Sequence, residues 1–289
     1  MSYQQLWRLL AQDFGEGEAK AIARMVYEVR YGLTFPDILL GKDERLAAEQ
    51  QEDLQDIVQR LLRHEPVQYV LGEATFCGRT FHVAPGVLIP RPETEELCRW
   101  VVEETRKDGI EEIRKRGIKD LQILDIGTGS GCIAITLAAE LPEAQVTAWD
   151  ISEEALDTAQ ANAHRLGTHV TFHHTDILNS QFSILNSQFS IIVSNPPYIC
   201  YQERATMERN VLDYEPNIAL FVPDDDPLLF YRVIAQFAQQ ALCEGGSLFF
   251  EINPHYANAL QDLLRAMRFS RIVLRNDQYE KPRMIHAIR

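Results

Sequence analysis

The chain has 289 residues, of which 46% are hydrophobic and 24% charged, and its formal net charge at pH 7 is −14. This composition predicts a soluble globular protein with a core of useful size, and no window approaches the roughly 20 apolar residues that a membrane span needs. Because DNA and RNA are polyanions, the acidic charge disfavours both as partners and suits a basic protein instead.

The start of the chain and its cysteines indicate a cytoplasmic protein. The first eight residues lack the basic start and the long apolar stretch of a signal peptide. The five cysteines are scattered, without the CxxC spacing of a zinc or redox pair, as expected of reduced thiols. His173 and His174 are neighbours on a predicted strand and face opposite sides, so we expect no metal site there.

Residues 1–74 predict a small helical domain. Its leucines at positions 6, 9 and 10 recur at helical spacing, and residues 49–63 form an amphipathic stripe that Pro66 is expected to end. Residues 75–90 predict a β-hairpin or a strand-rich connector, because aromatic and β-branched residues, Val87-Leu88-Ile89 among them, stand among glycine and proline.

Residues 91–289 predict an α/β domain. A helix is expected to begin after Pro92, and the charged stretch 107–120 is expected to be a surface helix or loop. Strand and helix patterns then alternate, which predicts a Rossmann-like, doubly wound and mostly parallel sheet with an antiparallel last strand. The expected strands are 122–126, 145–149, 170–174, 189–194, 247–252, 271–274 and 284–288, and the expected helices are 130–140, 153–166, 227–242 and 254–267.

A direct repeat interrupts this alternation. The heptapeptide of residues 177–183 recurs as residues 184–190. Two short copies cannot form a solenoid, so we interpret the repeat as a duplication that lengthens a surface loop. Only the second copy is expected to enter the strand before Asn195.

A glycine-rich loop follows the first strand of the α/β domain and opens a helix. Its spacing is G-x-G-x-G, and Cys132 stands where a dinucleotide fingerprint needs glycine or alanine. No Gly-Lys-Ser/Thr of a P-loop follows. The loop therefore favours a nucleoside cofactor without a bound pyrophosphate, and its residues are Gly127, Thr128, Gly129, Ser130 and Gly131.

Two carboxylates end the following strands. Asp150 is placed to accept hydrogen bonds from ribose hydroxyls, and Asp176 from an adenine amino group, with Ile177 beside it. A nucleoside that carries an amino acid fits this set, which indicates S-adenosylmethionine. A glycine-rich turn without a ligand is the alternative.

Asn195-Pro196-Pro197-Tyr198 ends the fourth strand, at the sheet edge where ligands bind in such folds. The side-chain oxygen of Asn195 and the carbonyl of Pro196 can accept both N–H groups of a substrate –NH2, while Tyr198 can lie against a flat substrate. The prolines make the segment rigid and leave it without N–H donors. The motif predicts methylation of a planar nitrogen, with Asn195 also bordering the cofactor.

These motifs resemble the HemK/PrmC family, the release factor glutamine N5-methyltransferases. The resemblance extends to residues 65–72, to residues 76–81 and to Leu88-Ile89-Pro90-Arg91-Pro92-Glu93-Thr94-Glu95. It implies a class I methyltransferase fold and a helical N-terminal domain that docks the release factor. It also implies S-adenosylmethionine as methyl donor, S-adenosylhomocysteine as product, and the glutamine of the Gly-Gly-Gln motif in bacterial class 1 release factors as acceptor.

The resemblance has four departures. The heptapeptide duplication lengthens the loop after Ile177 and could alter how closely this residue covers the adenine. Ser190 stands where the family often has aspartate, and Asn253 stands at the glycine position of the family's Glu-x-Gly. Glu280 stands at the glycine position of the pattern Asp-x-x-Gly-x-x-Arg, whose other positions match at Asp277 and Arg283.

Two other functions compete with the one implied. An adenine-N6 methyltransferase acting on DNA or RNA would use the same motif on a flipped base but needs a basic groove. A catalytically silent binding module would show damage to the glycine loop or to Asn195, and neither is damaged.

Overall fold

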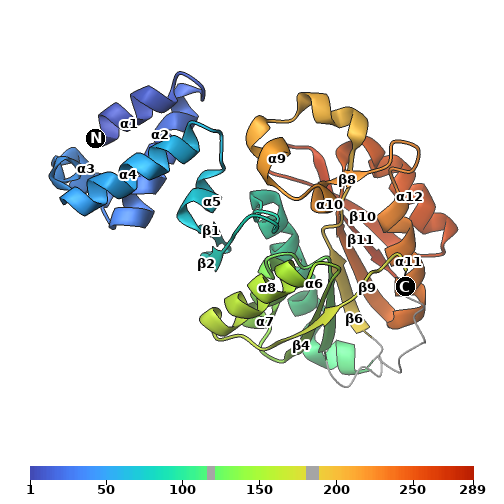
Figure 1. Cartoon of the computed structure of the whole chain (residues 1–289). Helices are drawn as coiled ribbons and strands as arrows, with labels where there is room; N and C mark the ends of the chain where they lie inside the picture. Colours follow the sequence, from blue (N-terminus) through green and yellow to red (C-terminus); the bar gives the residue numbers. More distant parts are fainter. Residues whose placement is uncertain (116–120, 180–188) are drawn as a thin grey trace. The chain divides into compact units, whose positions relative to one another are not determined.

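A computed structural model describes residues 1–115, 121–179 and 189–289 (Figure 1). The chain forms two compact units. The first consists of Met1–Glu73 with Met207–Tyr214, and the second of Ala74–Thr206 with Glu215–Arg289. The middle of the predicted duplicated loop, residues 180–188, lies outside the described residues.

The first unit is helical, as predicted. Its apolar stripes meet in one core that includes Leu6, Leu10, Tyr27, Leu54 and Leu61. The elements are α1 (Tyr3–Leu10), α2 (Glu16–Met25), a π-helical turn (Val26–Arg30), α3 (Phe35–Leu39), a 3-10 turn (Lys42–Arg45), α4 (Ala48–Leu61), α5 (Val67–Leu71) and α9 (Arg209–Tyr214).

Two details of the first unit differ from expectation. Helix α4 ends at Leu61, and Pro66 instead stands just before α5, where its fixed φ starts a new helix. Helix α9 was not predicted, since six residues show too little periodicity. The hydroxyl of Tyr214 at its end donates to the carbonyl oxygen of Arg63 at 2.8 Å.

The predicted connector contains one short hairpin. Strands β1 (Glu73–Phe76) and β2 (Arg79–His82) pair with each other, and Cys77 and Gly78 make the turn with φ of 47° and 71°. Val87-Leu88-Ile89 belongs to no strand, so that part of the expectation was wrong. Proline stands on both sides of this segment, and Gly86 has a φ of 96°, which prevents a regular strand.

The second unit holds a sheet of seven strands in the order β10-β11-β9-β6-β3-β4-β5. Strands β9, β6, β3, β4 and β5 are parallel, whereas β11 runs antiparallel to both of its neighbours. The predicted antiparallel last strand is thus confirmed. The strands are β3 (Leu121–Ile126), β4 (Ala144–Asp150), β5 (Val170–His174), β6 (Phe189–Ser194), β9 (Leu242–Glu251), β10 (Ser270–Asn276) and β11 (Pro282–Ile288).

Helices cover both faces of this sheet (Figure 1). Helices α6 (Pro92–Lys115), α7 (Cys132–Glu140) and α8 (Glu153–Leu166) share a core with Ile191 and Val193 of β6. Helices α11 (Leu229–Ala241) and α12 (Ala257–Ala266) share the opposite core with Ile192. Successive residues of β6 therefore face opposite layers, which is why this strand is buried throughout.

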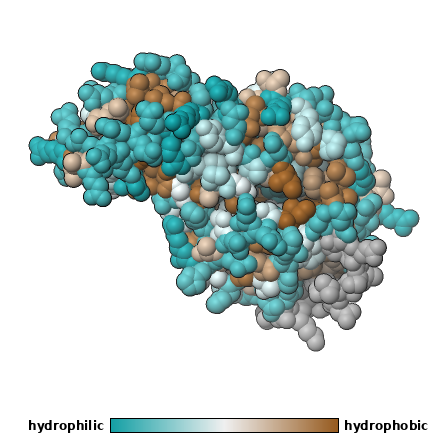
Figure 2. Space-filling view, viewed as in Figure 1, coloured by the Kyte–Doolittle hydropathy of each residue, from teal (hydrophilic) through white to brown (hydrophobic). Residues whose placement is uncertain are grey.

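Short elements complete the second unit. The pair β7 (Ile199–Cys200) and β8 (Phe221–Val222) forms a small parallel sheet, and α10 (Asn217–Leu220) lies just before β8. Figure 2 shows a mostly hydrophilic face of the molecule, with apolar residues gathered at a few places. Within the described ranges, every helix is too short or too polar to cross a membrane.

Candidate active site

The carboxyl ends of β3 and β6 lie side by side where the strand order reverses. The chain continues from β3 to β4 on one side of this point and from β6 to β9 on the other. Ligands bind at such a switch point in open α/β sheets. A cavity of about 210 Å³ opens here, and it is lined by residues that follow β3, β4, β5 and β6.

The glycine loop forms one wall of this cavity. Gly127, Gly129 and Gly131 all have positive φ, at 76°, 54° and 81°. A Cβ added to Gly127 or Gly129 would meet no atom within 4 Å, so open space adjoins both backbones. At Gly131 it would lie 2.8 Å from Ile135 Cδ1 and 3.0 Å from Ala159 Cβ. The first two glycines therefore leave room for a ligand, and the third allows the helices to pack.

The acid that precedes the loop, Asp125, is fully buried. Its Oδ2 accepts from the Thr128 hydroxyl at 2.7 Å and from the Ala134 amide at 3.2 Å, while its Oδ1 has no hydrogen-bond partner among the described residues. Burial raises the pKa of this carboxyl to about 7. In the same part of the chain, the buried Ser130 hydroxyl also lacks a partner. Ser130 lines the cavity, so its hydroxyl suits a polar ligand there, whereas Asp125 lies beneath the loop and is not a lining residue.

Asp150 lies on the cavity wall at the end of β4. Its Oδ2 accepts from the Gly129 amide at 2.8 Å and its Oδ1 from the Ser152 amide at 2.9 Å. Burial raises its pKa despite these bonds. Each carboxylate oxygen retains a lone pair, so hydroxyl groups of a ligand can still donate to it.

Asp176 and Ile177 follow β5 and also line the cavity. The Asp176 carboxylate accepts from the Leu178 amide at 2.8 Å and from the Asn179 side chain at 2.5 Å. Ile177 is buried against the core of the α11 layer. The structure therefore places the residues predicted to bind the cofactor around one cavity, except Gly131, which is not among the described residues that line it.

The substrate motif reaches the same cavity only in part. Asn195, Pro196 and Pro197 line it, whereas Tyr198 is not among the described residues that do. The Tyr198 hydroxyl instead donates to Glu251 Oε1 at 3.0 Å. Burial and the nearby Glu251 charge raise the pKa of Tyr198, which keeps the phenol protonated. Its expected contact with a flat substrate stays a prediction.

Two residues behind this motif were missed by the sequence analysis. Thr94 on α6 donates to Glu251 Oε2 at 2.6 Å and accepts from the Asn195 side-chain nitrogen at 3.2 Å. Thr94 is 2% and Glu251 1% exposed. The only signal in the sequence was their position inside blocks that resemble the family.

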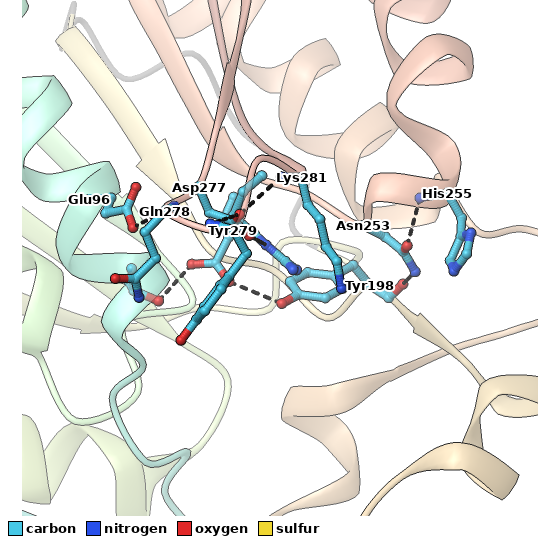
Figure 3. A network of polar contacts seen from close by, with 11 residues as sticks. Glu96, Tyr198, Asn253, His255, Asp277, Gln278, Tyr279 and Lys281 are labelled. Atoms are coloured by element: carbon cyan, nitrogen blue, oxygen red, sulfur yellow. Dashed lines mark hydrogen bonds and ion pairs between the residues drawn. The ribbon is translucent and has the colours of Figure 1, made fainter.

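The departure at Asn253 has a structural explanation. Asn253 donates to the Tyr198 carbonyl at 3.1 Å and accepts from the His255 amide at 3.0 Å, as Figure 3 shows. Its φ of −72° requires no glycine. Glu280, in contrast, has a φ of 62°, a conformation that glycine adopts more easily. Ser190 is buried, and its hydroxyl accepts from the Gln122 amide at 3.2 Å.

Comparison with known proteins shows the family of this chain. The PrmC N-terminal domain model matches residues 4–72, and the methyltransferase small domain model matches residues 110–212. A release factor glutamine methyltransferase of Bacteroides thetaiotaomicron is 45% identical over 94% of this chain and 93% of its own length. The chain belongs to the release factor glutamine methyltransferase family. A second relative of that name, from Flavobacterium psychrophilum, is 42% identical over 97% of this chain and 95% of its own.

Solved structures confirm the predicted fold. The 16S rRNA N2 G1207 methyltransferase of Thermus thermophilus, solved with AdoMet and guanosine, has a TM-score of 0.51 and 20% identity. The match covers 75% of this chain and 49% of that one. At this identity the likeness concerns the class I methyltransferase fold alone.

Proposed function

We propose that the protein transfers the methyl group of S-adenosylmethionine to the side-chain amide nitrogen, N5, of the glutamine in the Gly-Gly-Gln motif of class 1 release factors. One observation carries this proposal. In a member of the release factor glutamine methyltransferase family, Asn195 opens onto the same cavity as the glycine loop. Donor and acceptor sites thereby share one cavity, as direct transfer requires.

The residues around the cavity suit the cofactor. The open space beside Gly127 and Gly129 admits its amino-acid part, and the free lone pairs of Asp150 suit its ribose. Asp176 and Ile177 offer a polar and an apolar contact to its adenine. When bound, S-adenosylmethionine supplies a methyl group activated by a positive sulfonium, and S-adenosylhomocysteine remains.

The acceptor side has to activate a weak nucleophile. An amide nitrogen shares its lone pair with the carbonyl, so it attacks poorly. The Asn195 side-chain oxygen and the Pro196 carbonyl oxygen accept hydrogen bonds from its two N–H groups, which orients the nitrogen and increases its electron density. The nitrogen then gains the methyl group and loses one proton to water. Pro196 and Pro197 keep this segment rigid, and the hydrogen bond of Tyr198 with Glu251 anchors its end.

The remaining parts of the chain have proposed roles in substrate choice. The helical domain of residues 1–74 docks the release factor, residues 75–90 connect it, and residues 91–289 catalyse the transfer. The net charge of −14 disfavours nucleic acid as the direct substrate. We place the protein in the cytoplasm, where translation termination takes place.

One transfer assay tests the function. Labelled S-adenosylmethionine is offered with a class 1 release factor, with the same factor carrying alanine for the Gly-Gly-Gln glutamine, and with duplex DNA. Label is expected only in the unaltered factor, with a mass increase of one methyl group at that glutamine. Equal labelling of the alanine form, or labelling of the DNA, would overturn the proposal.

A further inference from the structure

The buried carboxylate of Glu251 is linked to both ends of the substrate motif, directly to Tyr198 and through Thr94 to Asn195. Glu251 ends β9, and the residue before it, Phe250, pairs with Ser194 at the end of β6. The two strand ends therefore bring Glu251 next to the motif that begins at Asn195. Glu251 accepts from Thr94 through Oε2 and from Tyr198 through Oε1, at 2.6 and 3.0 Å.

The hydrogen bonds of this group have a fixed direction. A carboxylate only accepts, so the single hydroxyl proton of Thr94 is committed to Glu251. The Thr94 oxygen then has only lone pairs left, and it accepts from Asn195 Nδ2 at 3.2 Å. A flipped Asn195 amide would instead place two acceptors against each other, which burial makes costly.

The direction of these bonds decides what Asn195 presents to the cavity. With Nδ2 held by Thr94, the amide oxygen is the atom left for a ligand in the cavity. The proposed reaction needs this oxygen, because a substrate –NH2 group only donates. With the amide flipped, Asn195 would offer a second donor to the substrate nitrogen and repel it.

We propose that Thr94 and Glu251 are positioning residues that set the orientation of the Asn195 amide for methyl transfer. This inference rests on the proposed function. Thr94 also lines the cavity, but its hydroxyl proton is committed to Glu251, so both residues act through Asn195.

The surroundings of Glu251 keep this arrangement in place. The Tyr231 hydroxyl donates to the Glu251 backbone carbonyl at 3.2 Å. Burial raises the pKa of the Glu251 carboxyl, whereas its hydrogen bonds with Thr94 and Tyr198 and the Arg283 charge favour the ionised form. Arg283 is itself held by Asp277 at 3.1 Å. Figure 3 shows the turn of residues Asp277 to Lys281 close to Tyr198. The Arg283 charge compensates part of the cost of a buried carboxylate.

The test removes the Thr94 hydroxyl and keeps its shape. We expect Thr94→Val to lower kcat for the release factor roughly 10- to 100-fold, the scale of a small misplacement at a reacting centre. KM for the release factor and the Kd for S-adenosylmethionine should change less than about threefold. Thr94→Ser restores the hydroxyl and should recover most of kcat.

A matched control lies on the same helix. Thr105 is also buried, and its hydroxyl donates only to the Val101 carbonyl of its own helix, at 2.7 Å. Thr105→Val therefore removes a buried hydroxyl from α6 without touching the motif, and kcat should stay within twofold. Thermal unfolding of each variant shows whether the fold persists, and Thr94→Ala replaces the valine variant if that one does not fold.

A double-mutant cycle separates positioning from other roles. If Thr94 acts through Asn195, Thr94→Val should cost almost nothing further in an Asn195→Ala background. An unchanged kcat in Thr94→Val, or the full loss repeated in the Asn195→Ala background, would overturn the inference. If the unaltered enzyme fails to methylate the release factor, the proposed function fails instead, so the two failures are distinct.

Discussion

Arg91 and Glu215 join two segments of the second unit that are 124 positions apart. The Arg91 Nη2 atom lies 2.5 Å from Glu215 Oε1, and the other oxygen of Glu215 accepts from the Ile89 amide at 3.2 Å. The Glu215 side chain is 1% exposed. Residues 86–91 line the cavity, as do Pro216, Ile218 and Ala219, so this ion pair joins two segments of the cavity wall.

Loss of Arg91 should therefore destabilise the fold. Arg91→Met leaves the Glu215 charge buried without its partner, which costs about 3 kcal/mol in the free energy of unfolding. Arg91→Met with Glu215→Gln should recover part of that loss, since glutamine still accepts from Ile89. Urea unfolding measures both variants. If Arg91→Met unfolds at the same urea concentration as the unaltered protein, the pair contributes nothing.

Gly131 differs from Gly127 and Gly129 in its surroundings, because only Gly131 has side chains close to the position of a Cβ. Gly129→Ala places a methyl group in open space at positive φ, which costs about 1–2 kcal/mol of stability and weakens S-adenosylmethionine binding roughly 10-fold or more. Gly131→Ala also collides with Ile135 and Ala159, so it should cost roughly 2–5 kcal/mol. Thermal unfolding and calorimetric titration compare them. Equal stability of the two variants would contradict this assignment.

Asn195→Ala separates the acceptor site from the cofactor site. Loss of one preorganised hydrogen bond to the reacting nitrogen should lower kcat roughly 10²- to 10³-fold. Cofactor affinity should change little, because Gly127–Gly131 and Asp150 remain. Turnover of the release factor is measured beside isothermal titration with S-adenosylmethionine. A large loss of cofactor affinity with unchanged turnover would refute the role given to Asn195.

Much of the fold could be predicted because periodicity is a local property. All seven strands of the main sheet appear in the sequence as short apolar or β-branched runs, and Gly167 marks the end of α8. Three short elements, β7, β8 and α9, show no clear apolar pattern and were missed. Strand β9 begins five residues earlier than expected, at Leu242, because its first part continues directly from α11.

In the site, the residues of local motifs could be predicted from the sequence, whereas the long-range contacts could not. Motif residues such as Asp150 and Asn195 follow strands, so the sheet topology brings them together. The Thr94–Glu251 bond joins residues 157 positions apart, and no local pattern carries such a pairing. The position of Tyr198 outside the cavity wall was likewise decided by Glu251 rather than by the motif itself.

Glu280 offers a stabilising substitution. Its φ of 62° costs a residue with a Cβ about 1–2 kcal/mol, and its side chain is exposed. Glu280→Gly removes that strain but adds freedom to the unfolded chain, so the net gain should be about 0.5–1 kcal/mol. A rise in the midpoint of thermal unfolding checks it, with Glu280→Ala as control for the loss of charge. A fall in stability of the glycine variant would show that the turn is not strained.

Asp125 should make the stability of the protein depend on pH in a specific direction. Burial raises its pKa in the folded state from an ordinary value of 3.8 to about 7. Between these values the unfolded chain has released the proton that the folded chain retains, so this group lowers stability as the pH rises from 4 to 7. The full effect is on the order of 4 kcal/mol.

Comparison with Asp125→Asn isolates this effect, since all other titrating groups are shared. Asparagine can still accept from Thr128 and from the Ala134 amide, but its amide nitrogen takes the place of an oxygen without a partner. That mismatch lowers the stability of the variant by the same amount at every pH. The test is therefore how the difference in the free energy of unfolding changes with pH, and not its absolute size. Urea unfolding at several pH values measures the free energy of unfolding of both proteins. The value for the variant should rise relative to that of the unaltered protein from pH 4 to 7, and the difference should stay constant above pH 7. Parallel curves over that range would mean that Asp125 ionises at its ordinary pH.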